Sequence, residues 1–203
     1  MQETVGAGHS DYTGSKMGMW FFLFTEMILF GGLFLLYSVY RTLNPDSFHA
    51  AARELNLILG SANTIILITS SLTMVLSISA LQNGNRRTSL CFLGMTVLLG
   101  GIFLVNKYFE WEAKIRHGIY PNAPLLLSLG HGKILFFGLY YVMTGLHGLH
   151  VFAGIVLLSF MFVSVVRGTT SSANCGRLEN SGLYWHLVDM VWIYLFPIFY
   201  LVT

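Results

Sequence analysis

MGMWFFLFTEMILFGGLFLLYSVY, residues 17–40, is long and apolar enough to cross a lipid bilayer as a helix. A spanning helix needs about 20 apolar residues, because each residue rises about 1.5 Å and the hydrocarbon is about 30 Å thick. Further stretches of this kind lie at 57–81, 89–109, 134–166 and 183–202. The sequence therefore predicts an all-α fold, an integral membrane bundle of five transmembrane helices over 17–203. A polar N-terminal arm at 1–16 precedes it, and we expect this arm to be partly disordered unless a partner orders it.

The composition supports a membrane protein. Of the 203 residues, 55% are hydrophobic and 10% are charged, whereas soluble domains average about 25% charged residues. The net charge is +2 and the basic residues are scattered, which gives no indication of nucleic-acid binding. The two cysteines form neither a CxxC pair nor a disulfide framework. The arm lacks the features of a signal peptide, so we expect the first helix to stay in the mature protein.

One acidic residue, Glu26, lies near the middle of the first predicted helix. A carboxylate at this depth costs roughly 2.5 kcal/mol or more, and neither flank offers a Lys or Arg within one helical turn. Its partner must come from another helix or subunit; otherwise Glu26 is protonated. It could be a protonated residue that hydrogen-bonds for packing. Because intramembrane carboxylates are rare, we favour a site for lipid, protons or subunit contact.

The second stretch, 57–81, is rich in hydroxyl groups. Ser70, Thr73 and Ser77 share one helix face, and Asn63 lies on the same seam. In lipid, small and hydroxyl-bearing residues allow helices to approach closely and to hydrogen-bond. We interpret this face as a packing surface.

The third stretch ends in KYFEWEAK, residues 107–114. Aromatic rings mixed with charges, here including Glu110 and Trp111, are typical of a membrane–water interface. Glu110 is at helical spacing from both Lys107 and Lys114 and could pair with either. The alternative is an ordinary solvated helix end.

The fourth and fifth stretches contain histidines. His147 and His150 share a face in TGLHGLHVFAG, as do His186 and Asp189 in YWHLVDMVW. A zinc or iron ion needs three or four ligands, so we expect no metal or haem site. We predict instead that these histidines hydrogen-bond and join the two helices. Arg167 ends the fourth helix where it can reach a lipid phosphate. No nucleophile with a convergent base and no phosphate-binding loop occurs, so no catalytic residue is predicted.

Five segments resemble, in order, subunit III of the haem–copper respiratory oxidases. They are WFFLFTEMILFGGLF (20–34), NTIILITSSLT (63–73), YFEWEA (108–113), TGLHGLHVFAG (144–154) and YWHLVDMVWIYLFPIFYL (184–201). The chain is similar to the five-helix form found in bacterial quinol oxidases. It departs from the longer cytochrome c oxidase form, which has two more helices at its N-terminus.

The resemblance implies a subunit without redox centres that packs on the catalytic subunit. Oxidase subunits I and II are the expected partners, with subunit IV or a larger respiratory supercomplex beyond them. Haems and copper would lie in the partner subunits, and this chain would bind structural phospholipids. Glu26 matches a carbodiimide-reactive carboxylate near a proton-uptake path and bound phospholipid, and Arg167 resembles a lipid-phosphate ligand. The matching residues that we interpret as structural are Asn63, Ser70, Thr73, His147, His150, His186 and Asp189.

Basic residues divide almost equally between the two sides of the predicted bundle, so the charge distribution does not set its orientation. By the resemblance, the chain lies in a bacterial inner membrane with its N-terminus cytoplasmic and its C-terminus periplasmic. Two alternatives remain at this point. One is a subunit-III-like component of a nitric oxide reductase, and the other is a small membrane carrier or channel that uses Glu26. A carrier would show internal repeats or broken helices in matching halves, and the sequence shows neither.

Overall fold

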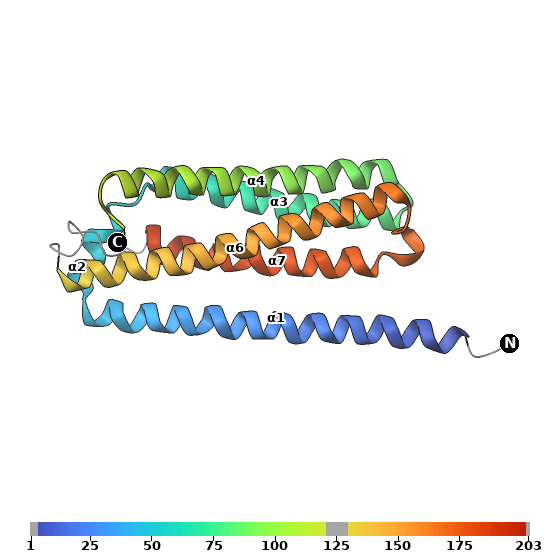
Figure 1. The fold of residues 1–203 in the computed structure, drawn as a ribbon, viewed down its shortest axis with the longest axis horizontal. Coiled ribbons are helices and arrows are strands. Elements are labelled where there is room, and N and C mark those ends of the chain that lie inside the picture. The colour runs from blue at the N-terminus through green and yellow to red at the C-terminus, as the bar shows by residue number, and fades with distance from the viewer. Residues whose placement is uncertain (1–3, 121–129, 202–203) are drawn as a thin grey trace.

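The structure is a computed structural model that describes residues 4–120 and 130–201. Within these residues the fold is all-α, as predicted. The elements are α1 (Thr4–Leu43), α2 (Pro45–Ala52), α3 (Leu57–Gln82), α4 (Arg86–Arg116), α6 (His131–Arg167), the short 3₁₀-helix η1 (Ser172–Asn174), α7 (Gly176–Phe196) and the π-helix η2 (Pro197–Leu201). Figure 1 shows α3, α4, α6 and α7 as an elongated bundle, with α1 running along one side of it.

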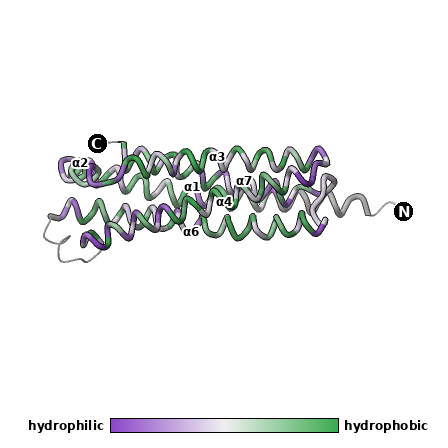
Figure 2. The backbone as a smooth tube through the Cα atoms, turned by 90° about the horizontal axis from the view of Figure 1, so that it is seen from above, coloured by the Kyte–Doolittle hydropathy of each residue, from purple (hydrophilic) through white to green (hydrophobic). Residues whose placement is uncertain are grey.

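Among residues 4–120 and 130–201, five helices are long and apolar enough to span a membrane, which confirms the predicted number. Figure 2 shows hydrophobic residues along the middle of the bundle, while hydrophilic residues gather toward the helix ends. Helix α1 is the most peripheral of the five. Only 11% of its most apolar window is buried, against 50% for the span formed by α7 and η2.

The helix bounds extend beyond the predicted spans. The range 17–40 becomes Thr4–Leu43, 57–81 becomes Leu57–Gln82, 89–109 becomes Arg86–Arg116, 134–166 becomes His131–Arg167, and 183–202 becomes Gly176–Phe196 followed by η2. Helix α1 begins at Thr4 and so includes most of the predicted arm at 1–16; residues 1–3 and 202 lie outside the described residues. Hydropathy marks the hydrocarbon thickness, whereas backbone hydrogen bonding continues into polar sequence on either side.

Helix α2 was not predicted, because the segment between the first two spans looked like a connector. Pro45 starts this helix at the first turn, where a missing N–H is tolerated. Phe48, Ala51 and Ala52 turn inward and are buried. Helix α3 begins soon after, capped by Asn56, whose side-chain oxygen accepts hydrogen bonds from two backbone N–H groups of the first turn.

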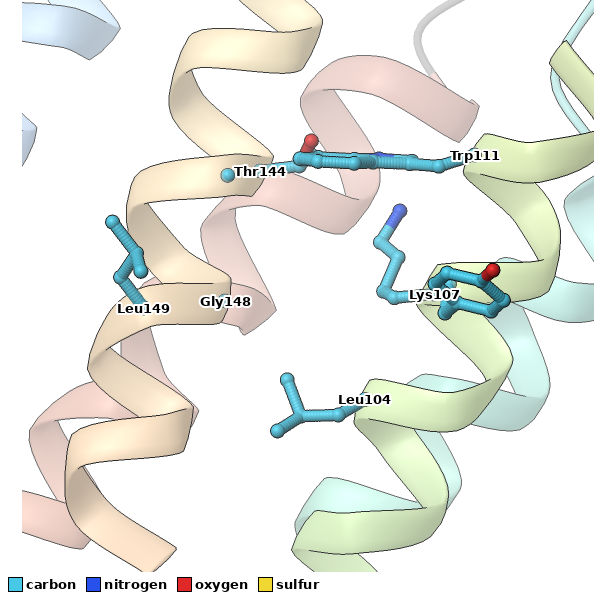
Figure 3. Close-up of a pocket in the computed structure, with 8 residues that line it drawn as sticks. Leu104, Lys107, Trp111, Thr144, Gly148 and Leu149 are labelled. Carbon is cyan, nitrogen blue, oxygen red and sulfur yellow. The ribbon is translucent and has the colours of Figure 1, made fainter. Parts of the chain in front are cut away.

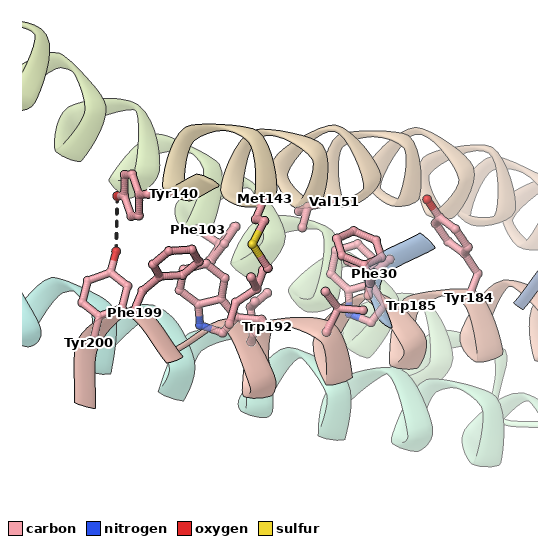
Figure 4. Packing of buried hydrophobic residues seen from close by; sticks show 14 of the residues in the cluster. Phe30, Phe103, Tyr140, Met143, Val151, Tyr184, Trp185, Trp192, Phe199 and Tyr200 are labelled. Carbon is pink, nitrogen blue, oxygen red and sulfur yellow. Dashed lines mark hydrogen bonds between the residues drawn. The ribbon is translucent and has the colours of Figure 1, made fainter. Parts of the chain in front are cut away.

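Large aromatic side chains fill the centre of the bundle, as Figure 4 shows between α6 and α7. Trp185 and Trp192 of α7 are fully buried, and the Phe103 ring meets Trp192 edge-on at 4.9 Å. Trp185 is wedged between glycines of two other helices. A Cβ atom on Gly100 would lie 2.6 Å from Cη2 of Trp185, and one on Gly154 would lie 2.8 Å from its Cε3. The indole of Trp185 therefore fits between α4 and α6 because glycines stand at these two positions.

We predict opposite effects for two neighbouring glycines. Gly100→Ala should destabilise the protein by about 1–3 kcal/mol, because the added methyl group overpacks Trp185. Gly101→Ala should be neutral or slightly stabilising, since nothing lies within 4 Å of its Cβ position and alanine favours helix. Unfolding of both variants in detergent, followed by circular dichroism, would check this. Equal losses of stability in the Gly100 and Gly101 variants would contradict the close packing of Trp185 against Gly100.

Candidate functional site

The mid-helix carboxylate of α1 finds its partner on α6. Oε2 of Glu26 lies 2.9 Å from Nε2 of His150, and the two side chains are 14% and 18% exposed. The atoms are at ion-pair distance, although their alignment falls short of a hydrogen bond. The partner therefore comes from another helix of the same chain, one of the origins that the sequence left open.

The contact of His150 with the backbone of its own helix places a hydrogen on one of its ring nitrogens. Nδ1 of His150 lies 2.8 Å from the backbone oxygen of Leu146, and a carbonyl oxygen can only accept. Nδ1 therefore carries a hydrogen. Nε2 then either carries a second proton as part of an imidazolium, or it is bare and faces a protonated Glu26. Either arrangement suits the 2.9 Å separation of the two atoms.

Aromatic residues surround the Glu26–His150 pair. The ring of Phe30 meets His150 edge-on at 5.4 Å, and Phe22 of α1 lies against Tyr184 of α7. The Tyr184 hydroxyl donates to the backbone oxygen of His150 at 3.0 Å. The pair is thus held where α1, α6 and α7 meet, in an apolar surrounding with limited access.

Sequence reasoning missed a buried charged cluster at the α2 end of the bundle, made of Lys107, Glu110, Tyr140 and Tyr200. Nζ of Lys107 donates to Oε2 of Glu110 at 3.0 Å, to Tyr200 at 2.8 Å and to Tyr140 at 3.2 Å. Both tyrosine hydroxyls donate to Oε1 of Glu110, at 2.5 and 2.8 Å. All three donors of the ammonium and both carboxylate oxygens are therefore used.

The i, i+3 pairing of Lys107 with Glu110 was one of the predicted options, and it is the one the structure shows. Glu110 is only 4% exposed, so the alternative of a solvated helix end is wrong for this residue. Trp111 packs on Tyr141 at 5.3 Å and against Gly145. Nζ of Lys114 donates a hydrogen bond to the backbone oxygen of Glu54 at 3.3 Å and does not form an ion pair with Glu110.

The hydroxyl face of α3 is buried against α4 and α7. Its contacts are Ser70 with the Thr96 backbone oxygen, Thr73 with the Thr96 hydroxyl, Ser77 with Ser89, and Asn63 with Asn106. Ser70 also accepts a hydrogen bond at 3.0 Å from the indole N–H of Trp185. The seam therefore joins three helices through side chains that share one face of α3.

The prediction that histidines join α6 to α7 is wrong. The side chain of His150 contacts α1, and Nδ1 of His186 lies 2.6 Å from the Ser71 hydroxyl of α3. His147 is fully buried, and neither of its nitrogens has a hydrogen-bond partner among the described residues. Its ring contacts both Phe103 and Trp192, at 5.5 and 5.3 Å, and these two rings also contact each other. Sequence spacing reveals a shared helix face but not which neighbour that face meets.

The two residues assigned to lipid and protons are not brought together. Arg167 is exposed at the end of α6, and 17 residues of helix, about 25 Å, separate it from His150, which contacts Glu26. Glu26 and Arg167 therefore cannot form one site. Among the described residues, no group of three or more His, Cys, Asp or Glu side chains is placed to hold a metal ion.

An apolar groove of about 460 Å³ lies between α4 and α6 (Figure 3). Leu104 and Leu149 line it from opposite helices, and the Trp111 indole closes one end above the Lys107 side chain. On the α6 side, Gly148 leaves open space, since nothing lies within 4 Å of its Cβ position. The lining of the groove is mostly apolar, and this property suits a hydrocarbon chain.

Comparison with known proteins gives a consistent result. The family model described as cytochrome c oxidase subunit III matches residues 3–203. A cytochrome c oxidase subunit 3 of Synechocystis sp. is 36% identical over 96% of this chain and 78% of its own length. A cytochrome bo(3) ubiquinol oxidase subunit 3 of Pseudomonas aeruginosa is 30% identical over 95% of this chain and 87% of its own. A heme-copper oxidase subunit I+III of Aeropyrum pernix is 29% identical over 92% of this chain and 22% of its own length.

We predict that replacing one member of the buried Lys107–Glu110 pair lowers the stability of the protein more than replacing both members. Glu110→Gln should destabilise by about 3 kcal/mol or more, because it leaves the ammonium buried without a counter-charge. The double variant Lys107→Met/Glu110→Gln should recover more than half of that loss. Equilibrium unfolding in detergent measures both.

The exposed pair of Glu112 and Arg116 on the same helix provides the control. Glu112→Gln should change stability by about 0.5 kcal/mol or less, because exposed pairs contribute little. Additive losses in the Lys107/Glu110 double variant would show that the two residues do not act as a pair.

Proposed function

The chain belongs to the cytochrome c oxidase subunit III family, and from this membership we propose that it is the non-redox subunit III of a haem–copper terminal oxidase in aerobic respiration. In this role it packs on the catalytic subunit, binds lipid and supports proton uptake and complex stability. The observation that carries the mechanism is the contact between Glu26 and His150 in the apolar part of the bundle. The matched relatives are oxidase subunits, which disfavours the nitric oxide reductase and carrier alternatives.

We assign the chain a place beside oxidase subunits I and II in a bacterial inner membrane, with the N-terminus cytoplasmic and the C-terminus periplasmic. The relative from Aeropyrum pernix is named subunit I+III, which supports close packing of these two subunits here. Subunit IV or a respiratory supercomplex would be further partners. The extensive apolar exposure of α1, with Phe21 68% and Leu35 71% exposed, leaves ample surface for lipid or neighbouring subunits.

Haems and copper belong to the partner subunits in this proposal, and the chain has no catalytic residue of its own. In support, His150 and His186 each contact a side chain of another helix within the bundle. His147 is fully buried and packs against the rings of Phe103 and Trp192.

Proton handling is assigned to the Glu26–His150 pair. An oxidase that reduces oxygen consumes protons, and the pair holds one proton that can pass between carboxyl and imidazole. The side chains of Glu26 and His150 are 14% and 18% exposed, so the pair lies at the edge of the bundle, where a neighbouring subunit would adjoin it. The apolar surrounding keeps competing hydrogen-bond partners away. The pair would thus act as a proton store beside the uptake route of the catalytic subunit, with no electron chemistry.

Lipid binding is assigned to two separate places. The groove between α4 and α6 would hold an acyl chain, since its lining is apolar and its volume is about 460 Å³. Arg167 at the end of α6 would bind a lipid phosphate, because an exposed guanidinium there can reach the headgroup region. Lipids held in this way would fix the packing of the bundle against its neighbours.

The proposal predicts that detergent-purified chain brings a haem-containing catalytic subunit with it. Mass spectrometry of the complex and its optical spectrum test this directly. Glu26→Gln should leave assembly intact but change lipid content or accelerate loss of oxidase activity during sustained turnover. Met27→Leu, at the neighbouring exposed position, is the matched control and should behave as wild type. A Glu26→Gln complex that keeps its lipids and its activity as long as wild type would refute the role given to Glu26.

A further inference from the structure

A pocket of about 360 Å³ lies at the α2 end of the bundle, between the start of α3 and the end of α4. Figure 1 shows α2, the end of α4 and the start of α6 at this same end. More than half of the lining residues have polar side chains, which are Glu54, Asn56, Glu110, Lys114 and His117. We call this feature the α3–α4 pocket. Charged groups of α4 and of the α2–α3 connection therefore meet in it.

Lys114 is a buried cation in the α3–α4 pocket without a counter-charge of its own. It is 8% exposed, and its one hydrogen bond among the described residues goes to the backbone oxygen of Glu54 at 3.3 Å. An ammonium group has three hydrogens to donate, so two of them lack an acceptor there. The rings of Phe137 and Tyr140 lie 5.7 and 5.8 Å from its nitrogen, but ring faces attract a cation without carrying a negative charge.

The carboxylates around the α3–α4 pocket are already paired with other cations. Glu110 pairs with Lys107 at 3.0 Å, and the Glu54 carboxylate lies 2.7 Å from Nζ of Lys133. Together with Lys114, three ammonium groups and two carboxylates gather here, which leaves one positive charge in excess. Residues 121–129 lie outside the described residues and contain no Asp or Glu, so their side chains cannot supply the missing negative charge.

The level of Lys114 in the bilayer indicates which anion is available to it. Helix α4 has 31 residues and is about 46 Å long, about 16 Å more than the thickness of the hydrocarbon layer. Its ends therefore extend into the headgroup layers, and Lys114 lies two residues before its end at Arg116. The phosphate of a phospholipid is the anionic group found at this level.

We propose that the α3–α4 pocket binds the phosphate group of a membrane phospholipid, whose oxygens accept hydrogen bonds from Lys114. A phosphodiester carries one negative charge, which matches the one positive charge in excess. The side-chain oxygen of Asn56 caps α3, so its amide nitrogen is a second donor at the pocket. The flexible stem of Lys114 lets the ammonium move toward the phosphate while its methylene groups stay buried.

The α3–α4 pocket is separate from the place assigned to Arg167. Lys133, which pairs with Glu54 beside the pocket, lies near the start of α6, and Arg167 ends the same helix. The helix between these two residues is about 51 Å long, so one headgroup cannot reach both places. The inference goes beyond the proposed function and does not depend on it, because every donor of the site belongs to this chain.

Native mass spectrometry of the detergent-purified full-length chain tests whether the ligand is a phospholipid. After removal of copurified lipid, the chain is titrated with dioleoylphosphatidylglycerol, with dioleoylglycerol, which lacks the phosphate, or with inorganic phosphate. Dioleoylglycerol should bind about tenfold more weakly than the phospholipid, since hydrogen bonds between charged groups are strong. Equal binding of the two lipids would overturn the role of the phosphate. Inorganic phosphate that displaces the phospholipid at equal concentration would overturn the assignment to a lipid.

Substitutions locate the bound phosphate. Lys114→Met keeps a long side chain without the charge and should weaken binding of the phospholipid about tenfold. Arg116→Gln is the matched control, because it removes a positive charge two residues away that is 76% exposed and paired with Glu112. This control should change binding by less than about twofold, since an exposed charge contributes little. Equal weakening in the two variants would reveal a general charge effect and contradict the pocket.

A second variant fills the α3–α4 pocket without a change of charge. Ala113 lines the pocket and is exposed, so Ala113→Trp should leave the fold intact and weaken binding of the phospholipid several-fold. This variant keeps the test decisive even if Lys114→Met fails to fold. Wild-type affinity in Ala113→Trp would overturn the inference. The oxidase assignment is unaffected by either result, because copurification with a haem-containing subunit tests it separately.

Discussion

Hydrocarbon offers no hydrogen bonds, and this constraint limits where polar side chains of the bundle can lie. The ammonium of Lys107 has all three donors used, by one carboxylate and two phenols. The Asn63 carbonyl accepts from the Asn106 amide of the neighbouring helix. Glu26 meets His150 across the α1–α6 contact. In each case the partner lies on a different helix or a different turn, so satisfying polar groups also fixes how the helices pack.

Close packing and hydrogen bonding depend on the same residues. In lipid the hydrophobic effect does not draw helices together, so van der Waals contact and interhelical hydrogen bonds have to do so. Trp185 shows both at once. Its ring fits only because Gly100 and Gly154 lack side chains, and its indole N–H donates to Ser70 of α3. One side chain of α7 thereby orients three other helices.

Bilayer thickness made the five spans predictable, because it sets a minimum length for any apolar helix. The face of α3 that carries Ser70 and Thr73 could be predicted from helical periodicity alone. The hydrogen-bond partners that these side chains find on other helices could not be predicted in this way. Tyr200 reaches Glu110 from a π-helical turn after Pro197, and nothing in local sequence gives the direction of that side chain. The helix ends were also missed, since hydropathy reports the membrane and not the backbone.

The two mid-membrane carboxyl groups show how one constraint can have two outcomes. Glu26 and Asp189 both lie near the middle of a span, where an acidic group is costly. Glu26 has the imidazole of His150 at 2.9 Å, so its polar partner lies inside the chain. Asp189 lies on the floor of a lateral groove without a donor for both oxygens. A chain that functioned alone would gain stability from an apolar residue at that position, since burying an unsatisfied carboxyl group has a large cost. The Ser71 hydroxyl beside this carboxyl group has one hydrogen to give, so packing elsewhere in the bundle has to offset the remaining cost.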